Sequence, residues 1–449
     1  MQVLQIPLSR TNLNTPRHLQ LCLPGDLAGL AHQVIGRCDQ AASFTEEPGK
    51  ITRTFLSQPM RGLHEQLTTW MHGAGMTVHL DAAGNLIGRY AGSDANHPVL
   101  LIGSHLDSVP DAGKYDGVLG VLLGVAAVQA LGGRRLPFGI DVIAFSEEEG
   151  VRFRAPFLGS RAICGQFDFG LLNRLDAHGI SMSEAFRDFG LDAERIAEAA
   201  YPIGRIGGYL EGHIEQGPVL DDLGVSVGVV TAIAGQSKLW MEFRGRAGHS
   251  GTLPMAGRRD ALAAAAELVL EIERLALETP ELRATVGALS VEPGAVNVVP
   301  GAARLCVDVR HAHDEIRTAA VAQIHDRALR LAARRAVELK LVEEEHHRAV
   351  PADPHFRTVL GAAVTATGQP LHQLPSGAGH DAAVLASVAP WAMLFVRSPG
   401  GVSHSPDERV FEGDVQVALD IVVRFLEMLA GAGPFANGDS RSSDCLGAS

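Results

Sequence analysis

The stretch Val99-Leu-Leu-Ile-Gly-Ser-His-Leu-Asp107 decides the fold of this chain. It begins with four consecutive apolar residues, a run of strand length. The segment Gly117–Leu131 is apolar on nearly all sides of a helix, and Ile140–Phe145 is a second apolar run. A strand, a buried helix and a second strand, both strands without polar alternation, predict a parallel βαβ unit covered on both faces.

Both predicted strands run directly into polar residues. Ser104–Asp107 follows the first strand, and Ser146–Glu149 follows the second. Ligands of such sheets bind at the carboxyl ends of the strands. We therefore expect the functional site at this edge of the sheet.

From about residue 228 the pattern changes to strands that alternate between apolar and polar residues. The expected order is βαββαβ, which is that of a ferredoxin-like module. The predicted elements are 238–244, 258–277, 284–291, 304–310, 314–336 and 337–344. The α/β pattern then returns with a helix at 356–367, a segment at 380–388, a strand at 392–396 and a helix at 414–429. We therefore predict a mixed α/β sheet with a parallel βαβ core and helices on both faces, plus an inserted ferredoxin-like domain.

Composition excludes several classes of function. The chain has 449 residues, with 38 Lys+Arg against 51 Asp+Glu and a net charge of −13. This balance argues against a nucleic-acid binder and against attraction to anionic lipid. None of the four lysines lies in a glycine-rich phosphate loop, which excludes P-loop chemistry.

Cysteines and apolar runs bear on the cellular compartment. The five cysteines are scattered without a Cys-x-x-Cys pair, so neither a disulfide framework nor a cysteine zinc site is expected. The longest apolar run, Val118–Val128, is too short to span a bilayer. Residues 1–30 lack the apolar centre of a signal peptide. These features predict a cytoplasmic protein with no membrane partner.

Five potential metal ligands fall at strand ends or in loops. They are His105, Asp116, Glu149, His213 and His404. Imidazole and carboxylate suit zinc, manganese, cobalt or nickel, and a carboxylate can bridge two such ions. Asp107 is expected to accept the second ring N–H of His105. Each residue also has an ordinary structural alternative: a hydrogen-bonded histidine, a solvated acidic loop at 147–149, or a helix N-cap at Asp116.

Eight motifs occur along the chain in the order of a known enzyme family. They are Gly103-Ser-His-Leu-Asp107, Asp111-Ala-Gly-Lys-Tyr-Asp-Gly117, Glu148-Glu-Gly-Val-Arg-Phe153, Gly212-His-Ile-Glu-Gln-Gly217, Gly248-His-Ser-Gly251, Asn297-Val-Val-Pro-Gly301, Ser376-Gly-Ala-Gly-His-Asp381 and Ser403-His-Ser-Pro406. Over residues 35–430 the chain resembles the amidase/carbamoylase branch of the dinuclear metallohydrolases, which also include aminoacylases and carboxypeptidase-like enzymes. The resemblance implies a zinc-exopeptidase-like fold.

Within that branch the chain most resembles the allantoate amidohydrolases. The stretches that carry this narrower match are Arg53–Ser57, Phe145–Phe153, Gly228–Gln236, Met393–Arg397 and Gly400–His404. The sequence departs from the usual pattern twice. Glu147 stands where aspartate is more usual, and serine replaces alanine after His249. Neither departure touches the ligand set.

The resemblance implies two divalent metal ions per subunit. One ion is held by His105, Asp116 and His213, and the other by Asp116, Glu149 and His404, with Asp116 bridging. Glu148 matches the general base. Manganese is the favoured metal, with zinc or cobalt as alternatives.

The resemblance also implies the substrate contacts. His249 matches a histidine that donates to the oxyanion, often from the partner subunit, and Arg310 suits a substrate carboxylate. The remaining substrate positions are Gln216, Asn297, Gly379 and His380. The alternatives are a turn role for Asn297, a surface charge at Arg310 and a structural histidine at His380.

The implied domain plan has four parts. Residues 26–227 and 348–431 form a metal-binding catalytic domain, and 228–347 form an inserted lid through which two subunits pair as a homodimer. Residues 1–25 are an irregular extension and 432–449 a disordered tail.

The implied reaction is hydrolysis of a ureido C–N bond of allantoate, in purine catabolism, giving ureidoglycine, ammonia and carbon dioxide. The alternatives within the branch are an N-carbamoyl-L-amino acid hydrolase, a β-ureidopropionase and a ureidoglycolate amidohydrolase. The partner is thus a small ureido acid, and no nucleic acid is expected. A ligand-binding protein on an inactive scaffold is disfavoured, because all five ligands and Glu148 are present.

Overall fold

The computed structural model describes residues 26–432 and 435, and the predicted extension at 1–25 lies outside them. Most of the predicted tail at 432–449 also lies outside the described residues. Phe435, within that tail, is half-buried and packs its ring 5.2 Å from that of Phe138. Among the described residues, no helix combines the length and the apolar character needed to cross a bilayer.

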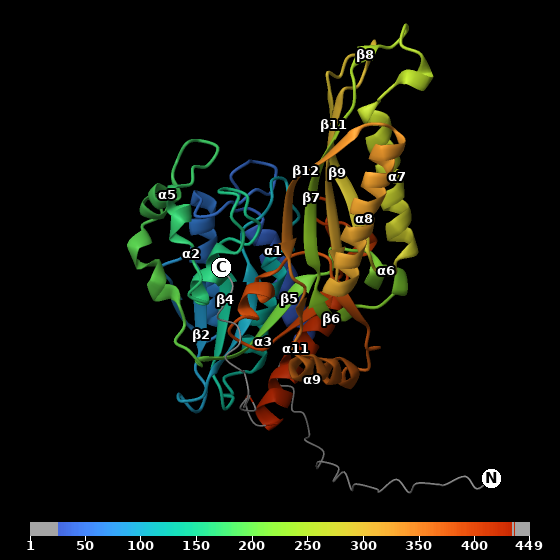
Figure 1. Ribbon diagram of the computed structural model, residues 1–449. Helices are drawn as coiled ribbons and strands as arrows, with labels where there is room; N and C mark the ends of the chain where they lie inside the picture. Colours follow the sequence, from blue (N-terminus) through green and yellow to red (C-terminus); the bar gives the residue numbers. More distant parts are fainter. Residues whose placement is uncertain (1–25, 433–434, 436–449) are drawn as a thin grey trace, which may run out of the picture.

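A nine-stranded mixed sheet forms the body of the molecule (Figure 1). Its strand order is β1-β2-β4-β3-β5-β15-β6-β13, with β14 paired to β6. The strands are β1 (Thr77–Leu80), β2 (Leu86–Tyr90), β3 (Val99–His105), β4 (Ile140–Phe145), β5 (Ile206–Ile214), β6 (Val227–Ile233), β13 (Val350–Pro351), β14 (Gln373–Ser376) and β15 (Trp391–Val396). The central strands β4, β3, β5 and β15 run parallel, and the mixed α/β class is confirmed.

Helices cover both faces of this sheet. In β3, Leu100 and Ile102 face one apolar core, and Val99 and Leu101 face another. This two-sided burial explains why the strand shows no polar alternation. The first core packs against α1 (Leu27–Ala41), α2 (Gln58–Gly73), α3 (Val118–Ala130), α9 (Pro354–Ala366) and α11 (Glu412–Ala432). The second packs against α4 (Leu158–Ile163), α6 (Val219–Leu223) and α10 (Asp381–Leu385).

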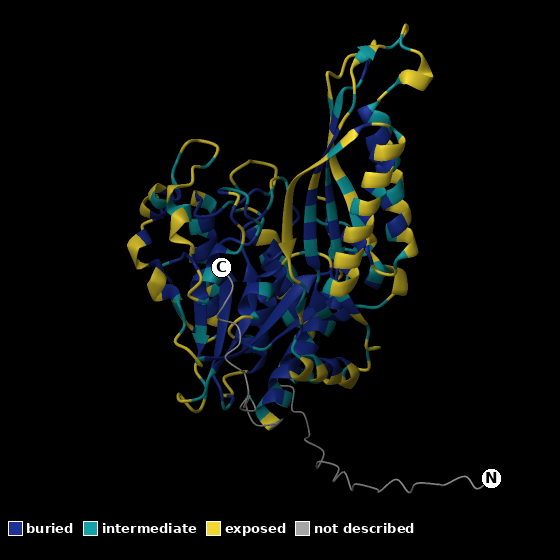
Figure 2. Cartoon of the chain, viewed as in Figure 1, coloured by how far each residue is buried: buried dark blue, intermediate teal, exposed yellow. Residues whose placement is uncertain are grey.

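A second, four-stranded antiparallel sheet projects from this body and has its own apolar core (Figures 1 and 2). Its strand order is β12-β7-β11-β9, and helices α7 and α8 cover one face. The bounds are β7 (Gly235–Arg244), α7 (Ala261–Glu278), β9 (Arg283–Glu292), β11 (Ala302–His311), α8 (Asp314–Arg334) and β12 (Glu338–His347). This is the expected βαββαβ order, to which β8 (Gly248–His249) and β10 (Val298–Val299) add a small ribbon at the tip. That the unit is an independent domain stays a prediction.

The predicted boundary at 228 is displaced by about seven residues. Strand β6 begins at Val227, yet it pairs with β15 and β14 in the large sheet. Val227, Val229 and Val230 are fully buried there. Both faces of β6 are covered by apolar cores, so its residues belong to the body, and the second sheet starts at Gly235.

Several elements of the body were not predicted, among them α1, α4 and β5, the strand that carries His213. Helix α5 (Met182–Asp188) and the 3₁₀ segments η1 (Phe169–Asn173) and η2 (Ala193–Ala199) lie between β4 and β5.

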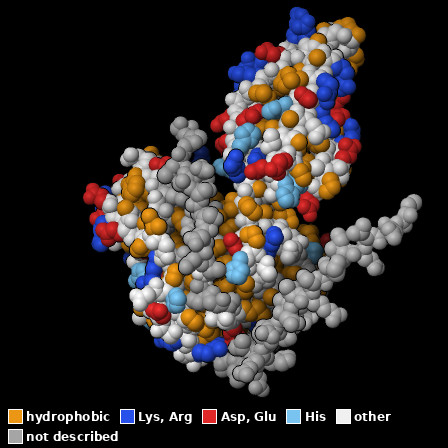
Figure 3. All heavy atoms as spheres, turned by 60° about the horizontal axis from the view of Figure 1, so that its bottom comes forward, with side chains coloured by type: hydrophobic (Ala, Val, Ile, Leu, Met, Phe, Trp, Pro, Cys, Tyr) orange, Lys and Arg blue, Asp and Glu red, His pale blue; other side chains and the backbone are white. Residues whose placement is uncertain are grey.

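Figure 3 shows the charges on one face of the molecule. On the part that contains the second sheet, Lys and Arg side chains are interspersed with Asp and Glu, and no single basic area dominates this face.

Candidate metal centre

The strand order of the large sheet brings the five predicted ligands together. His105 ends β3 and His213 lies near the end of the neighbouring parallel strand β5. Asp116 lies in the loop after β3, Glu149 in the loop after β4, and His404 in the loop after β15. Because β4, β3, β5 and β15 are adjacent and parallel, all five side chains meet at one edge of the sheet.

Asp116 divides the cluster into two groups. Its Oδ1 lies 3.2 Å from His213 Nε2 and 3.7 Å from His105 Nε2. The two histidine Nε2 atoms are 3.5 Å apart. Its Oδ2 lies 3.1 Å from His404 Nε2, which is 3.5 Å from Glu149 Oε1. Each oxygen of one carboxylate thus serves a different group.

These spacings fit metal ligation. Ligands with bonds of about 2.0–2.1 Å at tetrahedral angles place their donor atoms about 3.4 Å apart. Asp116 Oδ1 is buried with no hydrogen-bond partner, as expected of an atom reserved for a cation. The nitrogen and oxygen donors suit divalent ions of the zinc, manganese or cobalt type. The residues present therefore fit two ions that share Asp116.

The rings of both buried histidines are oriented by backbone carbonyls. His105 Nδ1 lies 3.0 Å from the carbonyl of Asp107, and His213 Nδ1 lies 2.9 Å from that of Ile214. The carboxylate of Asp107 is farther from His105 Nδ1, at 3.4 Å. It accepts instead from the N–H groups of Glu148 and Glu149, each at 3.0 Å. Asp107 therefore mainly fixes the acidic loop, a role that the sequence did not indicate.

Glu148 lies beside the first group, with one ligand atom each of His105, Glu148 and Glu149 close together. Burial raises the pKa of Glu148 well above its usual range, His105 opposes the rise, and Glu149 adds to it. Burial likewise raises the pKa of Glu149 to about 7. Glu147 points away: its Oε1 accepts from the N–H of Val151 within its own loop. The acidic run is thus a buried structure and not a solvated loop.

Gln216 and His380 both contact the cluster, but only Gln216 lines the cavity above it. Gln216 donates from Nε2 to Asp116 Oδ2 at 3.1 Å. His380 is buried, with its ring centroid 4.6 Å from that of His213, and its Nε2 lies 2.8 Å from the hydroxyl of Ser376. Burial lowers the pKa of His380 well below its usual range, so this ring is neutral.

A cavity of about 740 Å³ opens over the cluster. The part of the chain that forms the large sheet and its helices supplies Glu148, Glu149, Gln216 and Gly379, together with apolar residues that include Phe157 and Val384. Gly379 lies close to the ring of Phe157, and a Cβ atom at this position would be 3.0 Å from that ring, so a larger residue would require the ring to shift. The second sheet supplies a polar wall of Gln236, Lys238, Arg310, His346, His347 and Arg348.

Arg310 reaches this cavity with most of its donors already used. Its Nε and Nη2 donate to Asp308 at 3.0 and 2.9 Å, and its Nη1 donates to the carbonyl of Gly377 at 2.7 Å. Gln236 also donates to Asp308, at 2.7 Å. Two of its five N–H groups, one on Nη1 and one on Nη2, are left for a substrate carboxylate.

The structure does not bring His249 or Asn297 to the cluster. Both are exposed residues at the tip of the second sheet, where the N–H of Ser250 donates to the carbonyl of Asn297 at 2.9 Å (Figure 1). Neither lines the cavity over the cluster. Within one chain the expectation that these residues contact the substrate is not met, and action from a partner subunit stays a prediction.

Glu211 is a site neighbour that sequence reasoning missed. It is fully buried on β5, two residues before His213 and on the same face of the strand. One ligand atom each of Glu211, His213 and His380 lie close together. The spacing of two residues before a ligand on a buried strand was the available signal.

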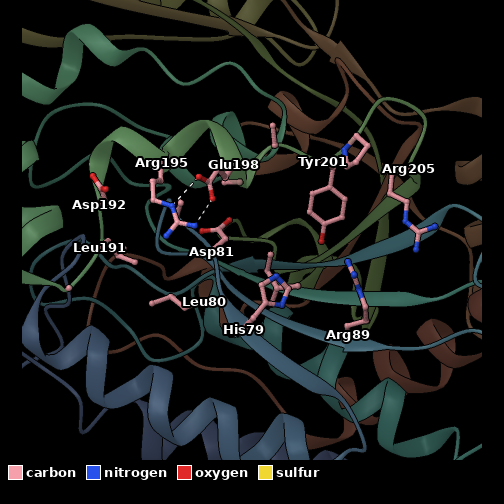
Figure 4. A pocket seen from close by; sticks show the side chains of 16 residues that line it. His79, Leu80, Asp81, Arg89, Leu191, Asp192, Arg195, Glu198, Tyr201 and Arg205 are labelled. Carbon is pink, nitrogen blue, oxygen red and sulfur yellow. Dashed lines mark hydrogen bonds and ion pairs between the residues drawn. The ribbon is translucent and has the colours of Figure 1, made fainter.

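A separate cavity of about 670 Å³ lies between β1, β2 and η2 and shares no residue with the cluster (Figure 4). Its arginines have partners. Arg89 is bound by the buried carboxylate of Asp141, and Arg195 by Glu198. Arg205 donates to backbone carbonyls.

The fold and the cluster together define a metal-dependent hydrolase. The profile of the peptidase family M20/M25/M40 matches residues 101–428. The chain belongs to this family, whose members use divalent metals, and it is an amidohydrolase of that family.

Relatives cover most of the chain. The N-carbamoyl-L-amino acid amidohydrolase of Geobacillus stearothermophilus is 40% identical over 85% of this chain and 94% of its own length. A probable allantoate deiminase of Oryza sativa subsp. japonica is 37% identical over 89% of each chain. The crystal structure of an amidase of the hydantoinase/carbamoylase family from Burkholderia multivorans superposes with a TM-score of 0.83 and 31% identity, over 89% of this chain and 98% of that one.

Proposed function

We propose that this enzyme hydrolyses a ureido C–N bond of allantoate, giving ureidoglycine, ammonia and carbon dioxide. The observation that carries the proposal is the pair of ligand groups joined by Asp116, with the buried Glu148 beside them. The relatives named for N-carbamoyl-amino acids and for allantoate support a ureido group as the reacting part of the substrate.

The cavity supports an anionic, polar substrate. Lys238, Arg310 and Arg348 line the same cavity as the metal ligands. Guanidinium binds a carboxylate in a fork, and allantoate presents one carboxylate and two ureido groups. We place the carboxylate at Arg310, with one ureido group over the cluster. Gln216, whose Nε2 already lies within hydrogen-bond distance of Asp116, borders the reacting carbonyl.

In this proposal the chain's own groups bind the substrate and move the proton. Two divalent ions, when bound, lower the pKa of a water and polarise the ureido carbonyl. Glu148 accepts a proton from the attacking water and delivers it to the leaving nitrogen. One water is consumed for each ureido group cleaved.

A second candidate substrate is an N-carbamoyl-L-amino acid. The relative from Geobacillus stearothermophilus favours it, and so does the apolar strip of Phe157, Ile233 and Val384, which suits an apolar side chain. The arginines of two stretches that matched the allantoate amidohydrolases, Arg53–Ser57 and Met393–Arg397, do not line the cavity over the cluster. Arg53 is buried and donates to backbone carbonyls, and Arg397 is paired with Asp414.

The test is ammonia release by metal-stripped protein after addition of Mn²⁺. Allantoate, several N-carbamoyl-L-amino acids, β-ureidopropionate and ureidoglycolate are compared by kcat/KM. Metal-dependent turnover that is highest on allantoate supports the proposal. Turnover confined to N-carbamoyl-L-amino acids would replace allantoate with the second candidate and leave the metal centre in place. Parallel activation with Zn²⁺ and Co²⁺ tests the preference for manganese.

We further propose that the enzyme is a homodimer in which His249 enters the cavity of the partner subunit. The support is the exposed position of His249 and Asn297 at the tip of the second sheet. The test mixes two inactive variants, Glu148→Gln and His249→Ala. If His249 acts across the interface, random pairing restores about a quarter of the wild-type activity, because only mixed dimers contain one intact site. If it acts within its own chain, the mixture stays inactive.

A further inference from the structure

Glu408 connects the two loops that carry Asp116 and His404. It lies in the turn between β15 and α11 and is 3% exposed. Its Oε1 accepts from the N–H groups of Tyr115 at 2.8 Å and Asp116 at 3.1 Å. Its Oε2 accepts from the hydroxyl of Ser403 at 3.1 Å. A single buried carboxylate thus joins the backbone of one ligand loop to the neighbour of another ligand.

The loop before Asp116 is shaped to admit this carboxylate. A Cβ atom on Gly113 would lie 2.2 Å from the carboxyl carbon of Glu408, far inside any allowed contact. Only glycine lets the two segments approach this closely. The loop before Asp116 and the turn that carries Glu408 are almost 300 residues apart in the sequence, and their close contact depends on Gly113.

His404 needs such a restraint. Its backbone φ is 53°, in the left-handed region that a histidine adopts at a cost. A conformation of this kind persists only where the surroundings hold it. Glu408 supplies two restraints: its own N–H donates to the carbonyl of Ser405, and its carboxylate holds Ser403. The residues on either side of His404 are thus fixed by Glu408.

The two halves of the cluster are supported in different ways. His105 and His213 stand on adjacent strands whose ladder fixes their spacing. His404 and Glu149 stand on loops. The group formed by Asp116, Glu149 and His404 depends on loop contacts. Glu408 joins the backbone of Asp116 to the His404 loop, and side-chain contacts of Ser403 and Gln216 with Asp116 Oδ2 add to this link.

We propose that Glu408 is a positioning residue that fixes Asp116 and His404 relative to each other. It thereby sets the metal affinity of the position formed by Asp116, Glu149 and His404, which is called the second position below. The inference rests on the metal centre of the proposed function. It goes beyond that function because it predicts that the affinities of the two ions depend to different extents on Glu408.

The experiment titrates metal-free protein with Mn²⁺ by calorimetry, which reads the number of sites and their affinities without turnover. Wild type is expected to bind two ions. Glu408→Ala should weaken the second ion by about 10- to 100-fold, the usual cost of losing a partner that orients ligands, and affect the first ion less. Glu408→Gln should restore most of the affinity, because its amide oxygen can still accept from both N–H groups. Glu427→Ala, which removes another largely buried carboxylate paired with Arg134, is the control and should change neither affinity.

The outcomes separate the possible failures. If wild type binds no Mn²⁺, the metal centre itself is wrong. If wild type binds two ions and Glu408→Ala binds both with unchanged affinity, the positioning role is refuted. An equal loss in Glu408→Gln and Glu408→Ala would also refute it, since charge and not hydrogen bonding would then be responsible. If Glu408→Ala does not fold, Ser403→Ala decides: unchanged affinity for the second ion overturns the proposal.

Discussion

Asp107 offers a sharp test of how the acidic loop is held. Its carboxylate is 1% exposed, and each of its oxygens accepts one backbone N–H, from Glu148 and from Glu149, at 3.0 Å. Asp107→Asn preserves the shape of the side chain. The amide has one oxygen only, so one of the two N–H groups must face an NH₂ donor.

The magnitude follows from that single lost bond. A hydrogen bond to a charged acceptor contributes about 1.5–3 kcal/mol, and the N–H left behind is buried. At about 1.36 kcal/mol for each factor of ten, the loss corresponds to about 10- to 150-fold. Because Glu148 and Glu149 are the residues displaced, we expect a loss of this size in kcat/KM and a smaller loss in Mn²⁺ affinity.

The assay compares ammonia release and Mn²⁺ calorimetry for wild type and Asp107→Asn. The matched control is Asp141→Asn, another fully buried aspartate, which binds Arg89 and Tyr201 far from the cluster. The control should lower the free energy of unfolding without changing Mn²⁺ affinity. Wild-type kcat/KM in Asp107→Asn would refute the reasoning, because it would mean that neither backbone bond positions the acidic loop.

Four more predictions address the base, the carboxylate anchor, the ions and pH. Glu148→Gln should lower kcat by about 10²- to 10⁴-fold while two Mn²⁺ ions stay bound in calorimetry; loss of metal would show that Glu148 is a ligand. Asp308→Asn should raise KM for ureido acids about tenfold with little change in kcat, because one charge-assisted bond that orients Arg310 is lost; equal KM values refute the anchor. Mn²⁺ at about 100 times its Kd should raise the free energy of unfolding by about 2.7 kcal/mol, and no change in thermal midpoint would contradict binding to the folded state. Burial raises the pKa of Asp81 from 3.8 to about 6, so its favourable contribution is complete below pH 3.8 and is lost as the pH rises through 6. In urea unfolding, the free energy of unfolding of wild type minus that of Asp81→Asn should change by about 3 kcal/mol between pH 3 and pH 7. A difference that stays constant with pH would refute the shift.

Local sequence determined the core of the fold and the ligand set. The uninterrupted apolar runs before His105 and Ser146 predicted buried parallel strands, because a strand covered on both faces has no polar side to show. His105, Asp116 and Glu149 end or follow those strands, so the parallel βαβ rule was enough to expect them at one edge. That β5 and β15 bring His213 and His404 to the same edge was decided by the strand order of the sheet. The βαββαβ order after β6 was equally visible, since its strands alternate and its helices have one apolar face.

Tertiary structure alone decided which contacts serve the site. Whether β6 joins the large sheet depends on its pairing with β15, which no local pattern encodes. Arg310 was expected to bind a substrate carboxylate, and only the structure shows that three of its five N–H groups donate to Asp308 and Gly377. His249 was expected near the substrate and lies at a distant tip. The link from Glu408 to the Asp116 loop gave no signal in the sequence, because Tyr115 and Asp116 lie almost 300 residues earlier in the chain. Periodicity reports which face of an element is buried, whereas hydrogen bonds between distant loops exist only once the chain has closed on itself.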